Sequence, residues 1–324
     1  MKLPRHKFLH LAASAAALPV VSPGAQAQAY PSRPVRVIVP FAPSGPTDVF
    51  ARVIAQQLSE NFGKQFIVEN IAGAAGNIGT GQAARSAHDG YTILITVNSY
   101  VVKPTLYNKI PYDPFRDFDP VTLAADAPVG FWINPSVPAK SLRDLVALIR
   151  ANPGKFSYAS GGVGGSGHLL AEQFRLSQGL DLVHVPFGGG GPAIASTVAG
   201  HIPIASTQLA PAVPHITAGK LRALAITKHS QFFPDVPTMG EAGYPDIDGT
   251  DWVGVLVPAG TPKEIINLLN RTFDMIMARP NTTERLAILG FAPVASTPEE
   301  FGARIRVEIE LWAKVIRAAN IKAE

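Results

Sequence analysis

Apolar runs alternate with small-residue turns and helix-like segments along most of this chain. The run VRVIVPF (35–41) leads through a loop of Pro, Ser, Gly and Thr into a helical pattern over 48–61, which Gly63 ends. The apolar runs at 65–71 and 91–99 continue the rhythm, with AGAAGNIG and the helix-like TGQAARSA between them. Such strand–helix–strand units favour an α/β fold with a parallel sheet and crossover helices.

A second series of the same kind begins at residue 128. Its predicted strands are PVGFWINP (128–135), KFSYAS, LDLVHVPF, HIPIASTQL and LRALAIT, with helices after the loops GGVGGSG and GGGG. Ser141 is the predicted N-cap and Gly154 the predicted stop of the helix between the first two of these strands. The chain therefore contains two similar α/β halves, without a detectable residue-level repeat between them.

The first 29 residues are typical of a secretory signal peptide. Lys2, Arg5 and Lys7 precede the apolar FLHLAASAAALPVV, and AQAQA offers cleavage after Ala27 or Ala29. Because this segment carries three basic residues and no acid, its removal lowers the formal net charge from +4 to +1. No basic run with interleaved aromatic residues remains, which disfavours nucleic-acid binding. The absence of cysteine excludes disulfides, thiolate metal sites and lipidation at the cleavage point, so we expect a periplasmic protein, with an uncleaved anchor as the alternative.

Two segments near the C-terminus each begin with Thr-Pro, at Thr261 and at Thr297. Threonine as N-cap, proline at the first helical position and glutamate in the first turn predict a helix in both places. C-terminal helices of this kind often pack back onto the first domain, which makes that domain discontinuous. We therefore expect a signal peptide at 1–29, a first lobe at 30–124 plus 229–324, and a second lobe at 125–228.

Four loops rich in small residues lie where predicted strands end and helices begin, at 42–48, 72–79, 160–167 and 188–192. In open α/β sheets, ligands bind beyond the carboxyl ends of the strands, where helix N-termini direct N–H groups outward. Any one loop could simply be a tight turn, but the four together favour a cradle for a small carboxylate or phosphate. Asp48 is the clear acid in these loops, and it is as suited to capping its own helix as to contacting a ligand.

Other chemistries fit the loops less well. GVGGSG (162–167) matches the dinucleotide-binding pattern, but the strand that follows carries its only acid, Asp181, at the beginning rather than the end. No Gly-Lys-Ser/Thr sequence is present for a phosphate-binding Walker loop. Ser166 and His168 leave a hydrolase as a weaker alternative, and the histidines lack the spacing of metal ligands. We therefore expect no catalytic residue, no metal and no cofactor.

Several motifs of residues 30–324 occur together, in an order typical of one family. They include YPSRPVRVIVPFAPSGPTDVFAR, IVENIAGAAGNIGT, AHDGYTIL, YDPFRDFDPVTL, VHVPFGGGGPAI and FPDVPTMGEAG. The chain resembles the Bug/TctC proteins, the solute receptors of tripartite tricarboxylate transporters. This resemblance implies a two-lobed type II periplasmic-binding-protein fold, a Venus flytrap that closes on an organic acid in the cleft between its lobes.

The resemblance also implies which residues hold the ligand. Loops from both lobes contribute, the first being Phe41 to Asp48, and the second lobe adds Ser160 to His168. The expected ligand-binding residues are Phe41, Ala42, Ser44, Gly45, Thr47, Asp48, Asn98, Ser99, Ser160, Gly162, Val163, Gly164, Gly165, Ser166, His168, Phe187, Gly189, Gly190, Pro192, Ala193, Thr207 and Gln208.

Two departures from the family pattern matter for the ligand. The opening loop has Ser44 where the family commonly has glycine, which adds a hydroxyl and restricts the backbone. The strand after His201 has Pro203, Thr207 and Gln208 where family members often have aspartate and asparagine. Because loss of an acid that faces the cleft disfavours ligands with an ammonium group, we expect a dicarboxylate, a tricarboxylate or an aromatic acid.

The sequence thus predicts an extracytoplasmic solute-binding protein that captures a small organic carboxylate by lobe closure and delivers it to a membrane transporter. Phe41, Phe187 and Trp252 are candidates for excluding water, although Trp252 also suits a core position at the lobe junction. We expect a monomer whose partner is a two-subunit membrane permease. The alternatives are an orphan or signalling receptor without a permease, and a hydrolase that uses Ser166 and His168.

Overall fold

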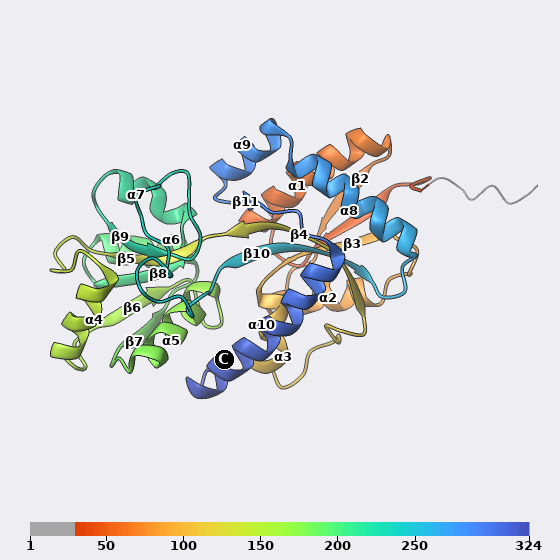
Figure 1. The fold of residues 1–324 in the computed structure, drawn as a ribbon. Coiled ribbons are helices and arrows are strands. Elements are labelled where there is room, and N and C mark those ends of the chain that lie inside the picture. The colour runs from red at the N-terminus through yellow and green to blue at the C-terminus, as the bar shows by residue number, and fades with distance from the viewer. Residues whose placement is uncertain (1–29, 324) are drawn as a thin grey trace, which may run out of the picture.

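The computed structural model describes residues 30–323, which form two α/β lobes, each built around its own sheet (Figure 1). The predicted signal peptide lies outside these residues. In Figure 1 the second lobe is the green part of the ribbon, and the first lobe combines the red and orange N-terminal part with the blue C-terminal part. The chain passes from the first lobe to the second between β4 and β5, and returns between β9 and β10.

The sheet of the first lobe has six strands in the order β11-β4-β10-β3-β1-β2. β1 is parallel to β2 and β3, as predicted, whereas β10 is antiparallel to both of its neighbours, β3 and β4. The expected parallel sheet is therefore mixed, because β10 enters it from the opposite lobe. The strands are β1 (Val35–Val39), β2 (Phe66–Asn70), β3 (Thr92–Val97), β4 (Phe118–Ala127), β10 (Asp251–Pro258) and β11 (Ala292–Pro293).

The sheet of the second lobe has five strands in the order β7-β6-β8-β5-β9. β6 is parallel to β7 and β8, and β5 is antiparallel to β8 and β9. β5 runs against its neighbours because it continues the direction in which the chain arrives from β4. The strands are β5 (Val129–Ile133), β6 (Ser157–Ser160), β7 (Val183–Pro186), β8 (Ile204–Gln208) and β9 (Arg222–Ile226).

Helices cover both faces of the first sheet and separate its apolar core into two layers. α1 and α8 bury one face, and α3 and α10 bury the other. In the second lobe α4 and α5 contribute to one apolar cluster and α6 to another. The helices are α1 (Pro46–Phe62), α2 (Asn77–Ala84), α3 (Ser99–Leu106), α4 (Leu142–Ala151), α5 (Ser166–Gln178), α6 (Gly190–Val198), α7 (Val213–Thr217), α8 (Lys263–Met277), α9 (Pro280–Ile288) and α10 (Pro298–Ala318).

The two C-terminal helices begin in different ways. Thr297 caps α10, as the sequence predicted, and in addition forms a capping box with Glu300. The same prediction for Thr261 was wrong: Pro262 occupies the cap position of α8, and the Thr261 hydroxyl instead donates to the carbonyl of Pro258 at 2.7 Å. The Thr261 hydroxyl is engaged by the turn before the helix and does not cap α8. The same Thr-Pro sequence therefore gives a threonine cap at α10 but not at α8.

The chain after β9 returns to the first lobe, where α8 and α10 both contact β4. The precise lobe boundaries at 124/125 and 228/229 stay predictions. Among residues 30–323, no helix has both the length and the apolar character needed to cross a membrane. Within the same residues, no group of three or more histidine and acidic side chains is arranged to hold a metal ion.

Candidate ligand-binding site

A cavity of ≈ 600 Å³ lies between the lobes, at the ends of strands from both sheets. The first lobe contributes Phe41 after β1 and the segment from Val97 to Ser99 at the end of β3. The second lobe contributes the loop around Gly165 and the segment around Gly190. This is the position in which open α/β sheets bind ligands, because strand ends and helix starts meet there.

Four helices begin at this cavity. Pro46, Ser99, Ser166 and Gly190 are the first residues of α1, α3, α5 and α6, and all four line the cavity. The first N–H groups of a helix have no partner within the helix, and the helix dipole places partial positive charge at this end. Their convergence places four partial positive charges at the cavity, and this arrangement suits an anion.

Two polar side chains at the start of α3 add hydrogen-bond donors. The Asn98 Nδ2 and Ser99 Oγ atoms are buried and have no hydrogen-bond partner among residues 30–323. Both residues line the cavity. A buried donor without a partner costs about 1–3 kcal/mol, so these two groups favour a ligand that accepts hydrogen bonds from them.

Asp48 shapes the opening loop instead of lining the cavity. Its carboxylate accepts hydrogen bonds from the Ser44 N–H at 2.9 Å, Arg52 Nε at 3.0 Å and Asn70 Nδ2 at 2.9 Å. Burial raises the pKa of Asp48, but these hydrogen bonds and the Arg52 charge outweigh burial and hold the pKa below its usual value. They also hold Ser44 at a φ of 67°, a left-handed conformation that costs a non-glycine residue about 1–2 kcal/mol.

Two stacked histidines support the glycine-rich loop of the second lobe. The rings of His168 and His184 lie 3.8 Å apart between centroids and are nearly parallel. His168 Nδ1 accepts from the Gly164 N–H at 3.0 Å, and His184 Nε2 lies 2.7 Å from Ser160 Oγ. Burial, with a smaller contribution from His184, lowers the pKa of His168 to about 3, and burial lowers that of His184 to about 4. Both rings are therefore neutral at physiological pH and fix the loop that carries Ser166.

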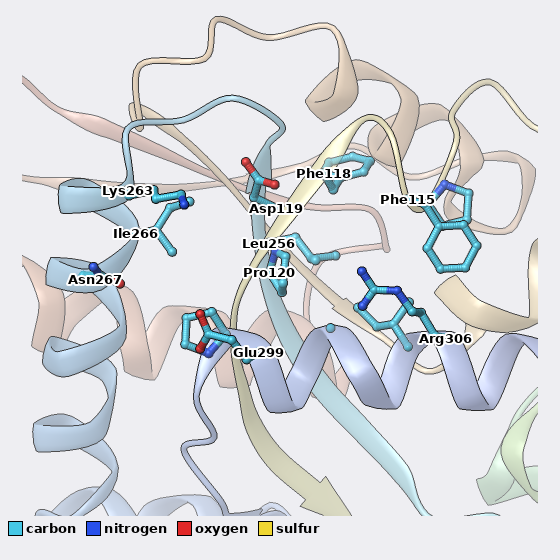
Figure 2. Close-up of a pocket in the computed structure, with 14 residues that line it drawn as sticks. Phe115, Phe118, Asp119, Pro120, Leu256, Lys263, Ile266, Asn267, Glu299 and Arg306 are labelled. Atoms are coloured by element: carbon cyan, nitrogen blue, oxygen red, sulfur yellow. The ribbon is translucent and has the colours of Figure 1, made fainter.

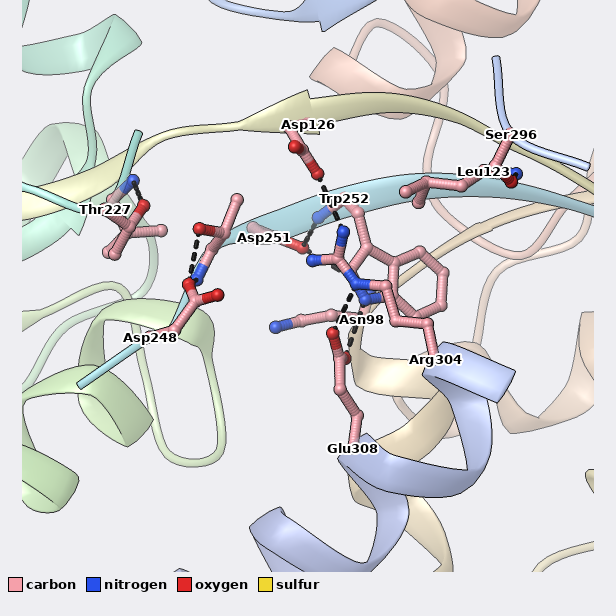
Figure 3. Close-up of polar contacts among 12 residues, drawn as sticks. Asn98, Leu123, Asp126, Thr227, Asp248, Asp251, Trp252, Ser296, Arg304 and Glu308 are labelled. Atoms are coloured by element: carbon pink, nitrogen blue, oxygen red, sulfur yellow. Dashed lines mark hydrogen bonds and ion pairs between the residues drawn. The ribbon is translucent and has the colours of Figure 1, made fainter. Parts of the chain in front are cut away.

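A buried acid, Asp251 at the start of β10, lines the cavity and was absent from the sequence prediction (Figure 3). Its carboxylate accepts from Gln208 Nε2 at 2.6 Å and from the N–H groups of Trp252 at 2.8 Å and Asn98 at 3.4 Å. Burial raises its pKa, against the effect of these hydrogen bonds. The strand after His201 has no acid, as expected, but the cleft contains this other acid, so the lack of one on that strand alone does not disfavour ligands with an ammonium group. Since Gln208 lies on β8, this contact also joins the two lobes.

Trp252 belongs to the core at the lobe junction. It is fully buried, its ring meets Phe301 edge-on, and its Nε1 donates to Glu308 at 2.8 Å. Arg304, also on α10, donates to Glu308 at 2.6 Å and to Asp126 on β4 at 3.1 Å (Figure 3). This network attaches α10 to both strands that run toward the second lobe.

The cavity brings together one part of the predicted site. Its lining includes the predicted residues Phe41, Asn98, Ser99, Gly165, Ser166, Gly190, Thr207 and Gln208. Thr47 lines a smaller hollow of ≈ 150 Å³ that also contains Phe41 and Asp251. Three predicted residues line a different hollow beside Tyr107, namely Gly162, Val163 and Phe187. The predicted residues outside these linings are Ala42, Ser44, Gly45, Asp48, Ser160, Gly164, His168, Gly189, Pro192 and Ala193.

Sequence reasoning also missed part of the lining, and one of the four expected loops does not reach it. No residue of the loop at 72–79 lines the cavity, whereas Leu289, Gly290 and Phe291 after α9 do. Gly290 follows a helical pattern and has a φ of 81°, so its sequence signal was that of a helix stop. Nothing in that signal indicated which surface the turn would face.

A second hollow, of ≈ 450 Å³, lies on the first lobe between α8 and α10 (Figure 2). Apolar residues such as Phe118 and Leu256 form part of its lining, and Asp119, Lys263 and Glu299 place charges of both signs around it. Two helices begin at this hollow, at Lys263 and Pro298, compared with four at the interlobe cavity. None of the predicted site residues lines it.

Two lobes with separate sheets, connecting strands between them and a cavity bounded by both define a two-lobed solute-binding protein. The chain belongs to the TctC family, because the model of the tripartite tricarboxylate transporter family receptor matches residues 50–321. The protein BugT of Bordetella pertussis is 39% identical over 300 residues, which span 91% of this chain and 92% of BugT.

Solved structures show the same relationship. R. palustris Rpa4515 with adipate has a TM-score of 0.76 and 33% identity, over 90% of this chain and 99% of that chain. MatC (Rpa3494) from Rhodopseudomonas palustris with bound malate has a TM-score of 0.72 and 30% identity, over 89% of this chain and 100% of that chain. The expected two-lobed fold and family are therefore confirmed.

Proposed function

We propose that this protein is a periplasmic receptor that captures a small organic carboxylate in the interlobe cavity and delivers it to a membrane permease. The cavity is the binding site, and closure of the lobes around the ligand excludes water. The closed form presents a surface that differs from the open form, which allows a permease to select the loaded receptor.

The observation that carries this proposal is the convergence of donors on one cavity. Four helix starts and the unpartnered Asn98 Nδ2 and Ser99 Oγ atoms line it, and the ligand they suit best is an anion that accepts several hydrogen bonds. Relatives with bound adipate and malate support a carboxylate as that anion. The volume of ≈ 600 Å³ accommodates an acid of this size.

A hydrolase that uses Ser166 and His168 is less well supported by the geometry. His168 Nδ1 already accepts from the Gly164 N–H, and burial lowers the pKa of His168 to about 3. An imidazole with so low a pKa is a weak general base, since effective bases have a pKa near the working pH. We therefore propose that the cavity binds its ligand without catalysing a reaction.

A thermal-shift screen tests this function. The purified protein, unfolded and refolded to remove co-purified ligand, is heated with adipate, malate, citrate, benzoate, aspartate and phosphate in turn. A ligand that binds the folded state alone raises the melting temperature by mass action, so at least one carboxylate is expected to do so.

Asn98→Asp and Asn108→Asp form a matched pair of variants for the same screen. Both change an amide to a carboxylate, but Asn98 faces the cavity and Asn108 is exposed on the same lobe. We expect the shift to disappear in Asn98→Asp, because a donor becomes a negative charge, and to persist in Asn108→Asp. The absence of a shift with every acid in the wild type would contradict the proposed function.

A further inference from the structure

A buried lysine without a counter-charge lies behind the wall of the interlobe cavity. Lys103 is on α3, and only 2% of it is exposed. Its Nζ atom has no hydrogen-bond partner among residues 30–323. Buried ammonium groups are normally paired, because an isolated buried charge costs several kcal/mol. The positive charge of Lys103 therefore needs either a partner of opposite charge or a functional reason to be buried.

The position of the ammonium connects it to the candidate site. Lys103 Nζ lies 5.7 Å from the ring centre of Phe41, and Phe41 lines the cavity. A Cβ added to Gly76 would come within 3.0 Å of this Nζ and 3.0 Å of the Pro40 carbonyl oxygen, so the ammonium sits at the carboxyl end of β1. Glycine at position 76 provides the space that the ammonium occupies.

The same helix face carries one of the unpartnered donors. Lys103 follows Ser99 by four residues on α3, and side chains at this spacing lie on one side of a helix. The helix starts at the cavity, with Ser99 in its lining and Lys103 one turn deeper. The positive charge thus lies one helical turn beyond Asn98 and Ser99, the residues whose side chains we propose to donate hydrogen bonds to the ligand.

The described part of the chain supplies no neighbouring anion that stabilises this charge. Burial alone lowers the pKa of Lys103, to about 8, and no carboxylate contributes an opposing effect. The amine is therefore still mainly protonated at neutral pH. The acid that does line the cavity, Asp251, already accepts from Gln208 and from two backbone N–H groups.

We propose that Lys103 is a specificity-determining residue of the cavity, whose positive charge favours dicarboxylates over monocarboxylates of the same length. The inference rests on the proposed function, since it assigns the charge of the ligand that the cavity takes. The ammonium acts across Phe41, through its field and without direct contact, and the second carboxylate of the ligand provides the counter-charge that the protein lacks. Because Lys103 is buried, this attraction is less screened than one between charges at the surface.

Matched pairs of acids measure this preference. Calorimetric affinities are determined for adipate against hexanoate and for succinate against butyrate, with the full-length wild type and with Lys103→Met and Lys103→Gln. We expect the dicarboxylate-to-monocarboxylate affinity ratio to fall roughly tenfold in both variants, which is the effect of a charge pair about 12 Å apart at an effective dielectric constant of about 20. Lys64→Met, an exposed lysine at the far end of α1, is the control for net charge and leaves the ratio unchanged.

The outcomes distinguish the role of Lys103 from the proposed receptor function. An unchanged ratio in both Lys103 variants, with binding retained, overturns the role of Lys103 and leaves the receptor function standing. An equal fall of the ratio in Lys64→Met also overturns it, because overall charge would then explain the preference. If the wild type binds none of the four acids or the acids of the thermal screen, the proposed function fails and the inference fails with it.

Discussion

Replacement of Lys103 by methionine is expected to stabilise the folded protein. Burial lowers the pKa of this lysine from 10.5 to about 8, which at about 1.36 kcal/mol per pKa unit means that the folded state disfavours its charge by about 3 kcal/mol. Methionine fills a similar volume without a charge. We therefore expect the free energy of unfolding of Lys103→Met to exceed that of the wild type by about 3 kcal/mol at pH 7.

The pH dependence distinguishes the charge from apolar packing. The unfolded chain keeps the lysine proton up to about pH 10.5, whereas the folded chain releases it above about pH 8. Between these values the unfolded state binds more protons, so wild-type stability gains from a rise in pH. The penalty is complete below about pH 8 and disappears toward pH 10.5, and the advantage of Lys103→Met shrinks over the same interval.

Urea unfolding at pH 7, 9 and 10.5, followed through the buried tryptophans, measures both effects. Lys64→Met serves again as the control and is expected to match the wild type at each pH. The reasoning is refuted if Lys103→Met is no more stable than the wild type at pH 7. It is also refuted if the full gain persists at pH 10.5, because the gain would then come from packing.

Three further changes test other parts of the site. Gly167→Ala should destabilise the second lobe by more than about 2 kcal/mol in urea unfolding, because its Cβ would overlap a backbone carbonyl of β8, whereas Gly188→Ala, with open space around it, should be neutral. Burial lowers the pKa of His168 to about 3 in the folded protein, so between pH 6.5 and 3 the unfolded chain binds a proton that the folded chain does not. The free energy of unfolding should therefore fall as the pH is lowered from 6.5 toward 3, and His168→Gln should flatten that slope. Gln208→Ala leaves the buried Asp251 one donor short and should lower the unfolding free energy by about 1–3 kcal/mol; a value near zero would show that the contact is dispensable.

The alternation of strands, glycine-rich turns and helices was enough to predict an α/β chain with loops at the ends of its strands. The loop after β1 is the clearest case, because VRVIV, the small residues and Asp48 specify a strand, a turn and a helix start within one short segment. Local patterns of this kind depend on contacts between residues close in sequence. Thr297 was predictable as the N-cap of α10 for the same reason.

The parts that could not be predicted depend on contacts between distant residues. Asp251 begins a strand that reaches the cleft only because β10 is inserted between β3 and β4, some 150 residues after β3. Lys103 is a residue type usually exposed, and its buried ammonium lies beside Phe41 and Gly76, which are distant from it in sequence. Ser160 and His168 were predicted to bind the ligand, yet their side chains hold the glycine-rich loop in place and do not line the cavity.

The placement of β10 also determines when the first lobe can be completed as the chain is made. β3 and β4 are consecutive strands in the chain, but they are not neighbours in the sheet, because β10, which ends at Pro258, lies between them. A chain emerging from the ribosome therefore holds its first four strands without their central partner until more than three-quarters of its length has been synthesised. Such late, long-range pairing slows folding. A truncation before β10 removes a central strand of the sheet. Nascent chains that end before β10 therefore cannot complete the first lobe.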